Sequence, residues 1–396
     1  MSNKKENYTS HEIDEDTARQ RRRESRLQMA KILMWSLFIL AVIIAGIELF
    51  LALRTFDDYE VTSSVNKTNG STSRFASFGD YLVEYSNDGI VYKEDEDNLI
   101  WNQSFEMTTP LISICEDYLA IYDQGGTQIY VINTDGDIAG LTMTRPIQKV
   151  CVAEQGSVAV LMVDEDEAYV ELYDTDGDKL AGGEFYQSEE TFPVDIALSY
   201  NARLLAVDSL SISGDTVETV MTFYNFGSVG QNEIDHIVGT YTFEDMMFPE
   251  IYYVSDSRMV AIGDSEYAVF DGSQKPSLSQ EVAYGVGVTS LFHNDKYVGI
   301  AFSNEDEDQT YHIQVFDLKG KTVMEGDTDL AYESIDFLEG NEICVLSRYA
   351  CDIYTIHSIH KFSYTFDTEV YHILSGASRT EYTFVLEGRI EEVRLK

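Results

Sequence analysis

The stretch LISICEDYLAIYDQGGTQIYVINTDGDIAGLTM, residues 111–143, contains four short apolar runs separated by polar turns. The runs are LISIC, YLAIYD, TQIYVIN and IAGLTM, and the turns between them are Glu116-Asp117, Gln124-Gly125-Gly126 and Asp135-Gly136-Asp137. Short apolar runs bounded by Gly, Asp and Asn are typical of strands joined by tight hairpins. The stretch therefore predicts one four-stranded antiparallel sheet.

The same pattern returns along the rest of the chain. An apolar or aromatic pair followed by a polar turn places its second apolar residue at positions 92, 132, 173, 224, 270, 316 and 362, at intervals of 40, 41, 51, 46, 46 and 46 residues. A period of roughly 40 to 50 residues made of short strands is typical of β-propeller blades. One blade cannot cover both of its faces, so we predict that the blades stack into a ring.

Four copies of this repeat are clear and three are weaker. The clear copies are Leu172-Tyr173-Asp174, Phe223-Tyr224-Asn225, Val269-Phe270-Asp271 and Val315-Phe316-Asp317. The weaker copies are Val91-Tyr92-Lys93, Val131-Ile132-Asn133 and His360-Lys361-Phe362-Ser363.

The two ends of the repeat region predict how the ring closes. From Tyr371 onward only three apolar runs remain, YHILSG, YTFVLE and IEEVRL, one fewer than a blade needs. A single run, YEVTSSV at residues 59–65, precedes the first repeat and can supply the missing strand. Such pairing removes exposed sheet edges, which promote aggregation. We therefore predict an all-β, eight-bladed propeller of four-stranded antiparallel blades; seven blades is the alternative if one weak repeat is not a blade.

One strongly apolar segment precedes the repeats. It begins at Ile32, ends at Leu53 and contains a single charge, Glu48. At about 1.5 Å per residue it spans roughly 33 Å, enough for a hydrocarbon core of about 30 Å. A cleaved signal peptide is the alternative, but its apolar region would be shorter and would lead into a small-residue cleavage site. We predict one transmembrane helix over residues 31–54, acting as a signal anchor.

The flanking charges predict its orientation. Arg and Lys are retained on the cytoplasmic side of a membrane, and six basic residues precede this segment: Arg19, Arg21, Arg22, Arg23, Arg26 and Lys31. We expect residues 1–30 to be a cytoplasmic, basic and disordered tail, and residues 55–396 to form an extracytoplasmic propeller. The protein would then be a single-pass protein of the cell membrane.

The charge of the exported part limits its partners. Residues 1–54 hold nine Lys or Arg and seven Asp or Glu, so the rest of the chain carries 18 basic and 62 acidic side chains, a net charge of −44. A polyanion repels nucleic acid and attracts cations and basic partners. Nucleic-acid binding is therefore excluded.

The architecture resembles a family of uncharacterised, single-pass, membrane-anchored propeller proteins of Gram-positive bacteria. The resemblance covers the whole chain: a basic tail, one anchor segment, then tyrosine-rich repeats with VFD or LYD strand ends. It implies no catalytic residues. The repeats also look like WD40 and quinoprotein blades. The Trp-Asp dipeptide is absent, and Trp35 and Trp101 are too few for the tryptophan docking motifs of quinone-dependent dehydrogenases.

Acidic clusters are the only candidates for a metal site. Calcium prefers six to eight oxygen ligands, and the candidates are Asp164 and Asp166 in one acidic run and Asp174, Asp176 and Asp178 in a DTDGD segment. An EF-hand loop has Gly at position six and Glu at position twelve, whereas here Gly comes fourth and between strands. We interpret these segments mainly as hairpin turns, with weak calcium binding as the alternative and no cofactor expected.

Cysteine and histidine suggest little chemistry. Cys344 and Cys351 flank a short turn and are a candidate disulfide, since they could face each other across one hairpin. His357 and His360 are three residues apart, which puts them on opposite faces of a strand, and His372 is further along the chain. No nucleophile triad, phosphate loop or CxxC motif occurs.

Three functions remain compatible with these patterns. The first is a non-catalytic module that binds an extracytoplasmic protein or a cell-wall ligand. The second is an exported hydrolase or lyase with carboxylates near the propeller channel, because propellers also carry enzymes. The third is a signalling component whose basic tail binds a cytoplasmic partner. The absence of a catalytic motif favours the first.

Overall fold

The computed structural model describes residues 31, 33–43, 46, 53–66, 73–79, 81–94, 98–165, 167–186, 191–213, 216–285, 287–304 and 310–396. The chain divides into two compact units, Met1–Thr55 and Phe56–Lys396.

In the first unit, residues 33–43 are helical and their side chains are exposed. Within the described residues, we find no helix that combines the length and the apolar character needed to cross a membrane. Ile32 and Glu48, which belong to the expected anchor, lie outside the described residues, and Leu53 lies in a turn. The membrane anchor remains a prediction.

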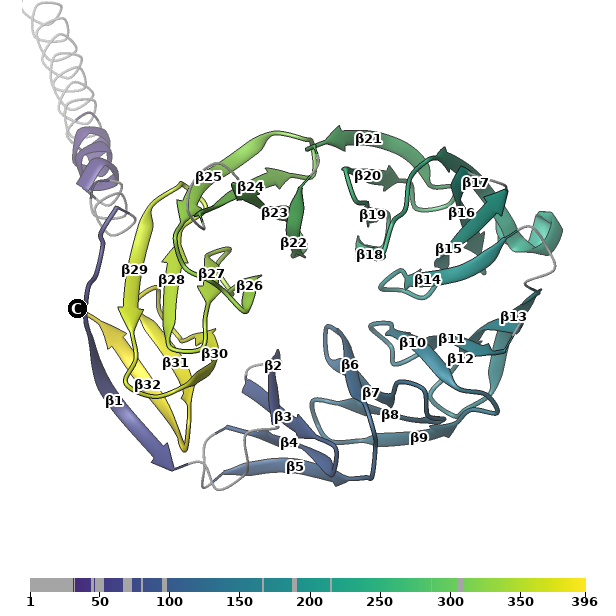
Figure 1. Ribbon diagram of the computed structural model, residues 1–396, viewed down its shortest axis with the longest axis horizontal. Helices are drawn as coiled ribbons and strands as arrows, with labels where there is room; N and C mark the ends of the chain where they lie inside the picture. Colours follow the sequence, from purple (N-terminus) through teal and green to yellow (C-terminus); the bar gives the residue numbers. More distant parts are fainter. Residues whose placement is uncertain are drawn as a thin grey trace, which may run out of the picture. The chain divides into compact units, whose positions relative to one another are not determined.

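The second unit is a ring of eight four-stranded antiparallel sheets, which confirms the predicted eight-bladed propeller and excludes seven blades (Figure 1). In each of the first seven blades the chain runs from the innermost strand outward. The eight blades are numbered here in chain order, with the closing blade last.

Blades 1 to 4 have the following strands. Blade 1 is β2 (Arg74–Phe78), β3 (Tyr81–Ser86), β4 (Gly89–Lys93) and β5 (Leu99–Ser104). Blade 2 is β6 (Pro110–Cys115), β7 (Tyr118–Asp123), β8 (Gln128–Asn133) and β9 (Ile138–Thr142). Blade 3 is β10 (Ile147–Val152), β11 (Val158–Asp164), β12 (Glu167–Tyr173) and β13 (Lys179–Tyr186). Blade 4 is β14 (Phe192–Leu198), β15 (Leu204–Ser213), β16 (Thr216–Asn225) and β17 (Ile237–Glu244), with the short 3-10 helices η1 (Gly230–Asn232) and η2 (Ile234–His236) before β17.

Blades 5 to 8 complete the ring. Blade 5 is β18 (Glu250–Ser255), β19 (Arg258–Ile262), β20 (Glu266–Asp271) and β21 (Ser277–Ala283). Blade 6 is β22 (Val288–His293), β23 (Tyr297–Asn304), β24 (Thr310–Asp317) and β25 (Thr322–Thr328). Blade 7 is β26 (Ser334–Phe337), β27 (Ile343–Leu346), β28 (Ala350–Tyr354) and β29 (His360–Thr365). Blade 8 is β30 (Val370–Ser375), β31 (Glu381–Leu386), β32 (Arg389–Leu395) and β1 (Tyr59–Asn66).

Blade 8 closes the ring by pairing the first strand with the last, as the incomplete final repeat predicts. β1 runs antiparallel to β32, from the pair Tyr59↔Leu395 to the pair Asn66↔Arg389. The two ends of the propeller therefore lie side by side in one sheet (Figure 1). β1 covers the edge of β32 that would otherwise be exposed and completes the fourth strand of blade 8, so the ring of local hairpins becomes one body.

The hydrophobic core lies between neighbouring blades. Phe223 of blade 4 and Phe270 of blade 5 are both fully buried, with ring centroids 4.9 Å apart. Burying one such side chain contributes roughly 1.5–3 kcal/mol. Every blade presents alternate strand residues to each neighbour, so the apolar alternation that marks the repeat also fills these interfaces.

Asp at the end of a repeat can have a structural role in the turn between the third and fourth strands. The Oδ1 atom of Asp317 accepts hydrogen bonds from the backbone N–H groups of Lys319 and Lys321, both at 2.9 Å. Such turns are favoured by Asp because its short carboxylate satisfies backbone donors locally. The endings at Asp174 and Asp317 are therefore turn-stabilising motifs, whereas the carboxylate of Asp271 accepts hydrogen bonds from the guanidinium of Arg258.

Two of the weaker repeat positions were predicted wrongly. Phe362 lies in the fourth strand of blade 7, whereas the third strand of that blade ends at Tyr354. Thr355 takes the position that Asp has in other turns, and its backbone N–H donates a hydrogen bond to the carbonyl of Ile359 at 2.9 Å. In blade 1 the equivalent residue is Glu94, one position later than expected, because its N–H bonds to the carbonyl of Asn98. Short strands in blade 7 and a different turn in blade 1 shift the register.

Candidate functional site

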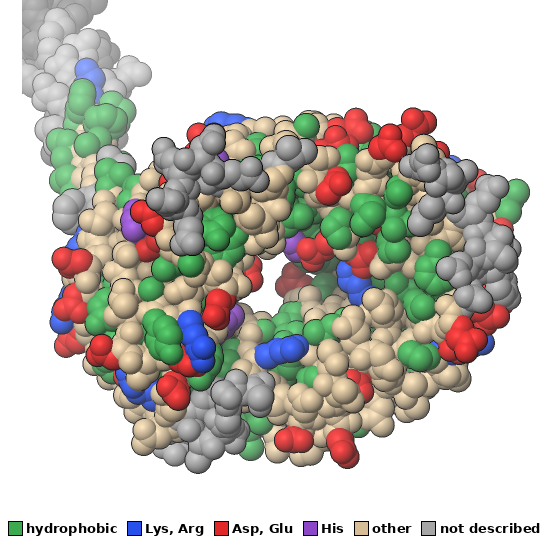
Figure 2. Space-filling view, viewed as in Figure 1, with side chains coloured by type: hydrophobic (Ala, Val, Ile, Leu, Met, Phe, Trp, Pro, Cys, Tyr) green, Lys and Arg blue, Asp and Glu red, His purple; other side chains and the backbone are tan. Residues whose placement is uncertain are grey.

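The centre of the ring is open, and charged side chains gather around the opening (Figure 2). The first strand of each blade is the innermost and lines this channel (Figure 1). Five consecutive inner strands, β10, β14, β18, β22 and β26, each place an ionisable residue there: Lys149, Asp195, Glu250, His293 and Asp336. A polar channel of this kind is the main candidate site.

Asp195 joins three blades. One of its carboxylate oxygens lies 2.6 Å from the Nζ atom of Lys149 in blade 3, and Oδ2 accepts a hydrogen bond from the backbone N–H of Ile251 in blade 5 at 2.9 Å. Asp195 is 4% exposed. Burial raises the pKa of Asp195 although Lys149 and the backbone donors oppose the change. Burial alone would lower the pKa of Lys149, but the neighbouring Cys151 and Asp195 outweigh it and the pKa is raised.

Asp208 lies directly opposite Asp195 in the β14–β15 register. It is fully buried, and neither carboxylate oxygen has a hydrogen-bond partner among the described residues. Burial, and then the charge of Asp195, raises the pKa of Asp208 to about 8. Two facing carboxylates in one buried site seldom both ionise, so Asp208 carries a proton at neutral pH.

A second group of side chains continues around the channel in blades 5 to 7. The carboxylate of Glu250 accepts a hydrogen bond from Nε2 of His293 at 3.1 Å. The ring of Tyr252 stacks on the same imidazole, with ring centroids 3.6 Å apart. The bond to His293 lowers the pKa of Glu250. The side chain of Asp336 keeps exposed surface, but the surrounding protein reduces the solvation of its carboxylate. This partial burial raises the pKa of Asp336.

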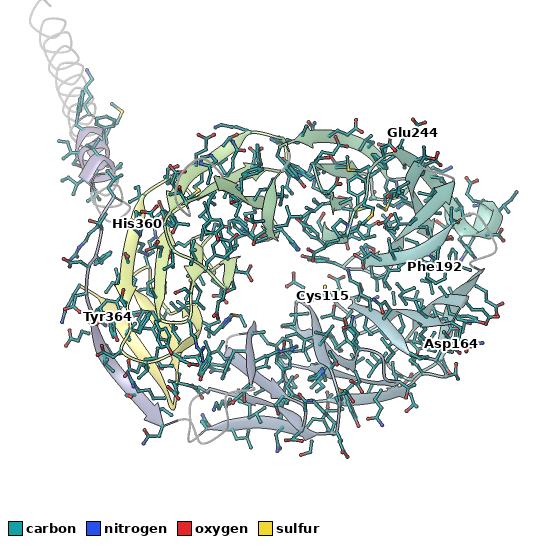
Figure 3. All side chains as sticks on the ribbon, in the orientation of Figure 1. Cys115, Asp164, Phe192, Glu244, His360 and Tyr364 are labelled. Atoms are coloured by element: carbon teal, nitrogen blue, oxygen red, sulfur yellow. The ribbon has the colours of Figure 1, made fainter. Side chains whose placement is uncertain are left out.

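One mouth of the channel is acidic. The turns between the first and second strands carry Glu116, Glu154 and Asp256, which belong to blades 2, 3 and 5. Burial raises the pKa of Cys115 to about 12, and these three carboxylates add to the effect. Cys115 lies on the inner side of the ring (Figure 3). Such a mouth attracts cationic groups and repels anions.

The acidic residues proposed as calcium ligands do not meet in one site. Oδ1 of Asp174 accepts the N–H groups of Asp176 and Asp178 at 3.0 and 2.9 Å, so this segment is a hairpin turn. Asp164 ends β11 toward the outside of blade 3 (Figure 3), and Asp166 lies outside the described residues. Over the part of the chain that the structure describes, no group of three or more His, Cys, Asp or Glu side chains could hold a metal ion.

The two cysteines of blade 7 do not face each other directly. Cys344 pairs with Ile353 and Cys351 pairs with Leu346, so the thiols are diagonal neighbours across β27 and β28. Both are buried free thiols in the structure. The turn is centred between Arg348 and Tyr349, one residue later than direct pairing of the two cysteines requires, so each cysteine lies two residues away from the other's direct partner. Burial raises the pKa of both thiols.

The histidines are also used separately. His360, in the outer strand β29 (Figure 3), lies 3.1 Å from Oδ1 of Asp352 and stacks on Tyr354. His357 lies in the preceding turn and not in a strand. Burial lowers the pKa of His372 in β30.

The sequence analysis missed the channel residues. A signal was present, because Asp195 and Lys149 interrupt the apolar pattern of the first strand in their repeats. Their partners lie about fifty residues away in other blades, however, and the spacing within one repeat contains no information on that contact.

The fold and the channel define a closed eight-bladed β-propeller with a charged central channel. Residues 52–395 match the model of the family of unknown function DUF5711, and the chain belongs to this family. No curated protein matches the sequence.

Several solved structures resemble the chain. The crystal structure of a eukaryotic initiation factor is 14% identical to this chain, with a TM-score of 0.47. The similarity covers 77% of this chain and 90% of the initiation factor chain. The WD40 domain of Neurospora crassa Pan2 is 9% identical over 72% and 88% of the two chains, with a TM-score of 0.42. Kluyveromyces lactis Hsv2 is 8% identical over 80% and 99%, with a TM-score of 0.43.

Proposed function

We propose that this protein is a non-catalytic binding module, held outside the cell membrane by residues 31–54, that takes a basic protein or cell-envelope ligand. The observation that carries the proposal is the pairing of the channel charges. Lys149, Asp195 and Ile251 form one link between blades, and Glu250 and His293 form another. These groups hold blades together, and the acidic mouth and surface remain for binding.

The charge of the propeller supports a basic partner. The region after residue 54 carries a net charge of −44, which favours association with cationic surfaces and makes it sensitive to salt. A repeat scaffold offers a wide, rigid surface for such contacts.

Crosslinking in intact cells tests the binding function. The full chain is crosslinked, captured, and its partners are identified with and without 0.5 M salt during the wash. We expect a basic protein or a wall polymer. Turnover of cell-wall glycans or peptides by the purified protein at enzymatic rates would overturn the proposal.

Protease added outside intact cells tests the location. We expect the protease to digest the propeller in intact cells, because the propeller lies on the outer side. A tag placed before residue 30 should stay protected. Deleting residues 1–54 should move the protein out of the membrane fraction. A protected propeller in intact cells would overturn the proposed orientation.

One observation favours a catalytic alternative. Asp195 and Asp208 are facing carboxylates in different environments, and such pairs divide acid and base roles in many hydrolases. If this alternative holds, Asp208→Asn and Asp195→Asn should each abolish turnover of a wall-derived substrate while leaving binding of that substrate within a few-fold of the wild type.

A further inference from the structure

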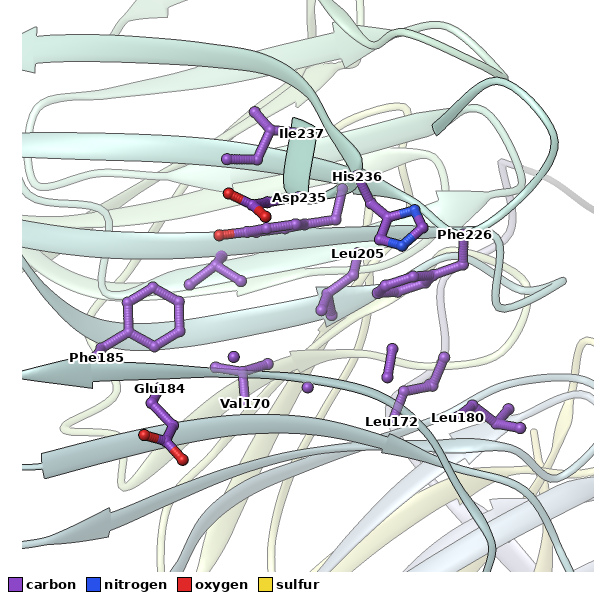
Figure 4. Close-up of a pocket in the computed structure, with 15 residues that line it drawn as sticks. Val170, Leu172, Leu180, Glu184, Phe185, Leu205, Phe226, Asp235, His236 and Ile237 are labelled. Carbon is purple, nitrogen blue, oxygen red and sulfur yellow. The ribbon is translucent and has the colours of Figure 1, made fainter. Parts of the chain in front are cut away.

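An apolar cleft of about 460 Å³ opens between blades 3 and 4 (Figure 4). Val170 and Leu172 of β12 form one wall, and Leu205 and Val207 of β15 form the other. The aromatic rings of Phe185 and Phe226 lie nearer its two ends (Figure 4). The volume is within the range of roughly 300–1,000 Å³ that is usual for ligand sites.

The cleft exists because the outer strand of blade 3 has small residues at two positions that face blade 4. Ala181 lies opposite Leu172 and Gly183 lies opposite Val170. At the two equivalent positions, each of blades 1, 2, 4, 5, 6 and 7 has at least one large apolar residue. In chain order these residues are Trp101, Leu141, Tyr241, Val282, Met324 and Phe362. Blade 3 is thus under-filled at a place where its counterparts are packed.

Exposed apolar residues surround the mouth of the cleft. Leu180 is 55% exposed and Ile237 is 37% exposed, and both line the opening. Ile234, in the 3-10 helix that contains His236, is 85% exposed. Apolar residues gathered beside a hollow interface are typical of a binding surface.

Charge indicates which occupant the cleft takes. Asp235 of blade 4 lies on one wall of the cleft, whereas Glu184 of blade 3 is paired with Tyr169 and its carboxylate points away from the cleft (Figure 4). Among the described residues that line the cleft there is no Lys or Arg. An apolar group that enters is therefore favoured if it is attached to a positively charged segment.

We propose that the cleft between blades 3 and 4 binds an apolar side chain, aromatic or branched aliphatic, from a basic peptide segment of a protein partner. This inference rests on the proposed function and names the chemistry of its partner. The side chain fills the space left by Ala181 and Gly183, and a flanking Lys or Arg residue pairs with Asp235.

Short peptides test the proposal on the full-length protein. The probe is acetyl-KFLK-amide, with acetyl-EFLE-amide and acetyl-KGGK-amide as comparisons, and binding is followed by NMR or fluorescence anisotropy. We expect the first peptide to bind at least tenfold more tightly than either of the others. Equal binding of the acidic peptide, or of the peptide without apolar residues, would overturn the proposal.

Two variants locate the binding. Gly183→Leu fills the cleft, and space is available because a Cβ there meets only the Phe185 ring, at 3.6 Å. We expect a loss of affinity of at least tenfold. Gly140→Leu is the matched control: it lies on the outer strand of blade 2, and its Cβ meets only the Tyr130 ring, also at 3.6 Å. This control should bind like the wild type.

Asp235→Asn keeps the test valid if Gly183→Leu fails to fold. Asp235 has a φ of 53°, and Asn tolerates this left-handed conformation. We expect affinity for acetyl-KFLK-amide to fall roughly three- to tenfold, with a weaker salt dependence. Unchanged affinity in both Gly183→Leu and Asp235→Asn would refute this site.

Failure of the inference and failure of the proposed function give different results. If crosslinking in cells captures a basic partner equally with wild type and Gly183→Leu, the propeller binds elsewhere and only the cleft assignment fails. If no basic partner is captured by wild type and no peptide binds, the proposed function fails as well.

Discussion

Replacing Asp208 by Asn should change how the stability of the propeller depends on pH. Asp208 is fully buried opposite Asp195, and its pKa is raised from 3.8 to about 8. In the unfolded chain the same carboxyl ionises near pH 4. The unfolded state therefore releases its proton first as the pH rises, so ionisation of Asp208 favours unfolding between about pH 4 and about pH 8.

The size of the effect follows from this difference in pKa. Each pH unit in that window lowers the free energy of unfolding by about 1.36 kcal/mol for one such group, so from pH 5 to pH 7 the loss is roughly 3 kcal/mol. Asparagine has nearly the shape of a protonated Asp but does not titrate. Asp208→Asn should therefore lose roughly 3 kcal/mol less than wild type over this range.

Urea unfolding of the full chain at pH 5, 6 and 7 measures this slope. Trp101 is 7% exposed and lies in the propeller, so its fluorescence reports the transition. Asp329→Asn is the control, since Asp329 is an exposed residue just after β25, and it should keep the wild-type slope. If wild type and Asp208→Asn lose stability in parallel from pH 5 to pH 7, Asp208 is not protonated in the folded protein and the reasoning is refuted.

Three further substitutions or treatments have defined outcomes. Asp195→Ala leaves the half-buried Lys149 without its carboxylate, and we expect a loss of about 3–5 kcal/mol in urea unfolding; a loss below 1 kcal/mol would contradict the blade-linking role. Asp317→Ala removes the acceptor of two turn N–H groups and should cost about 1–2 kcal/mol, measured in the same way, with the fold retained by circular dichroism. Cys344 and Cys351 should resist alkylation at pH 8 in the native protein, because burial raises the pKa of both thiols, and should react fully without reductant after denaturation. Detection of a disulfide-linked peptide by mass spectrometry would contradict the last expectation.

Much of the ring could be predicted because each blade is built from local hairpins. The turn at Asp174 and the turn at Asp317 have the same hydrogen bonds, and this local chemistry produced the repeat that marks the blades. The incomplete last repeat likewise predicted closure by β1. Where a strand is short, as in β26 and β27 with four residues each, the apolar pattern was too brief to fix the register, and Phe362 was placed in the wrong strand.

The candidate sites could not be predicted in the same way, because they are formed between blades. Asp195 contacts a lysine from the blade before it and an amide from the blade after it, and such contacts depend on the stagger of neighbouring sheets. The cleft depends on what is missing from one strand. Gly183 looks like an ordinary strand glycine until its position is compared with Tyr241 and the other large residues of equivalent strands.

Closure of the ring by β1 and β32 also sets the order in which the protein can be completed. Thr62 donates a hydrogen bond to the carbonyl of Glu392, a partner 330 residues later in the chain. During synthesis β1 therefore waits with an open edge until β32 has been made. A truncated chain that lacks β32 can form the other hairpins but cannot close the ring. The edges of β31 and β1 are then exposed to proteases and to strands of other molecules. Pairing of β32 with β1 thus makes closure of the ring depend on the strand of the propeller that is made last.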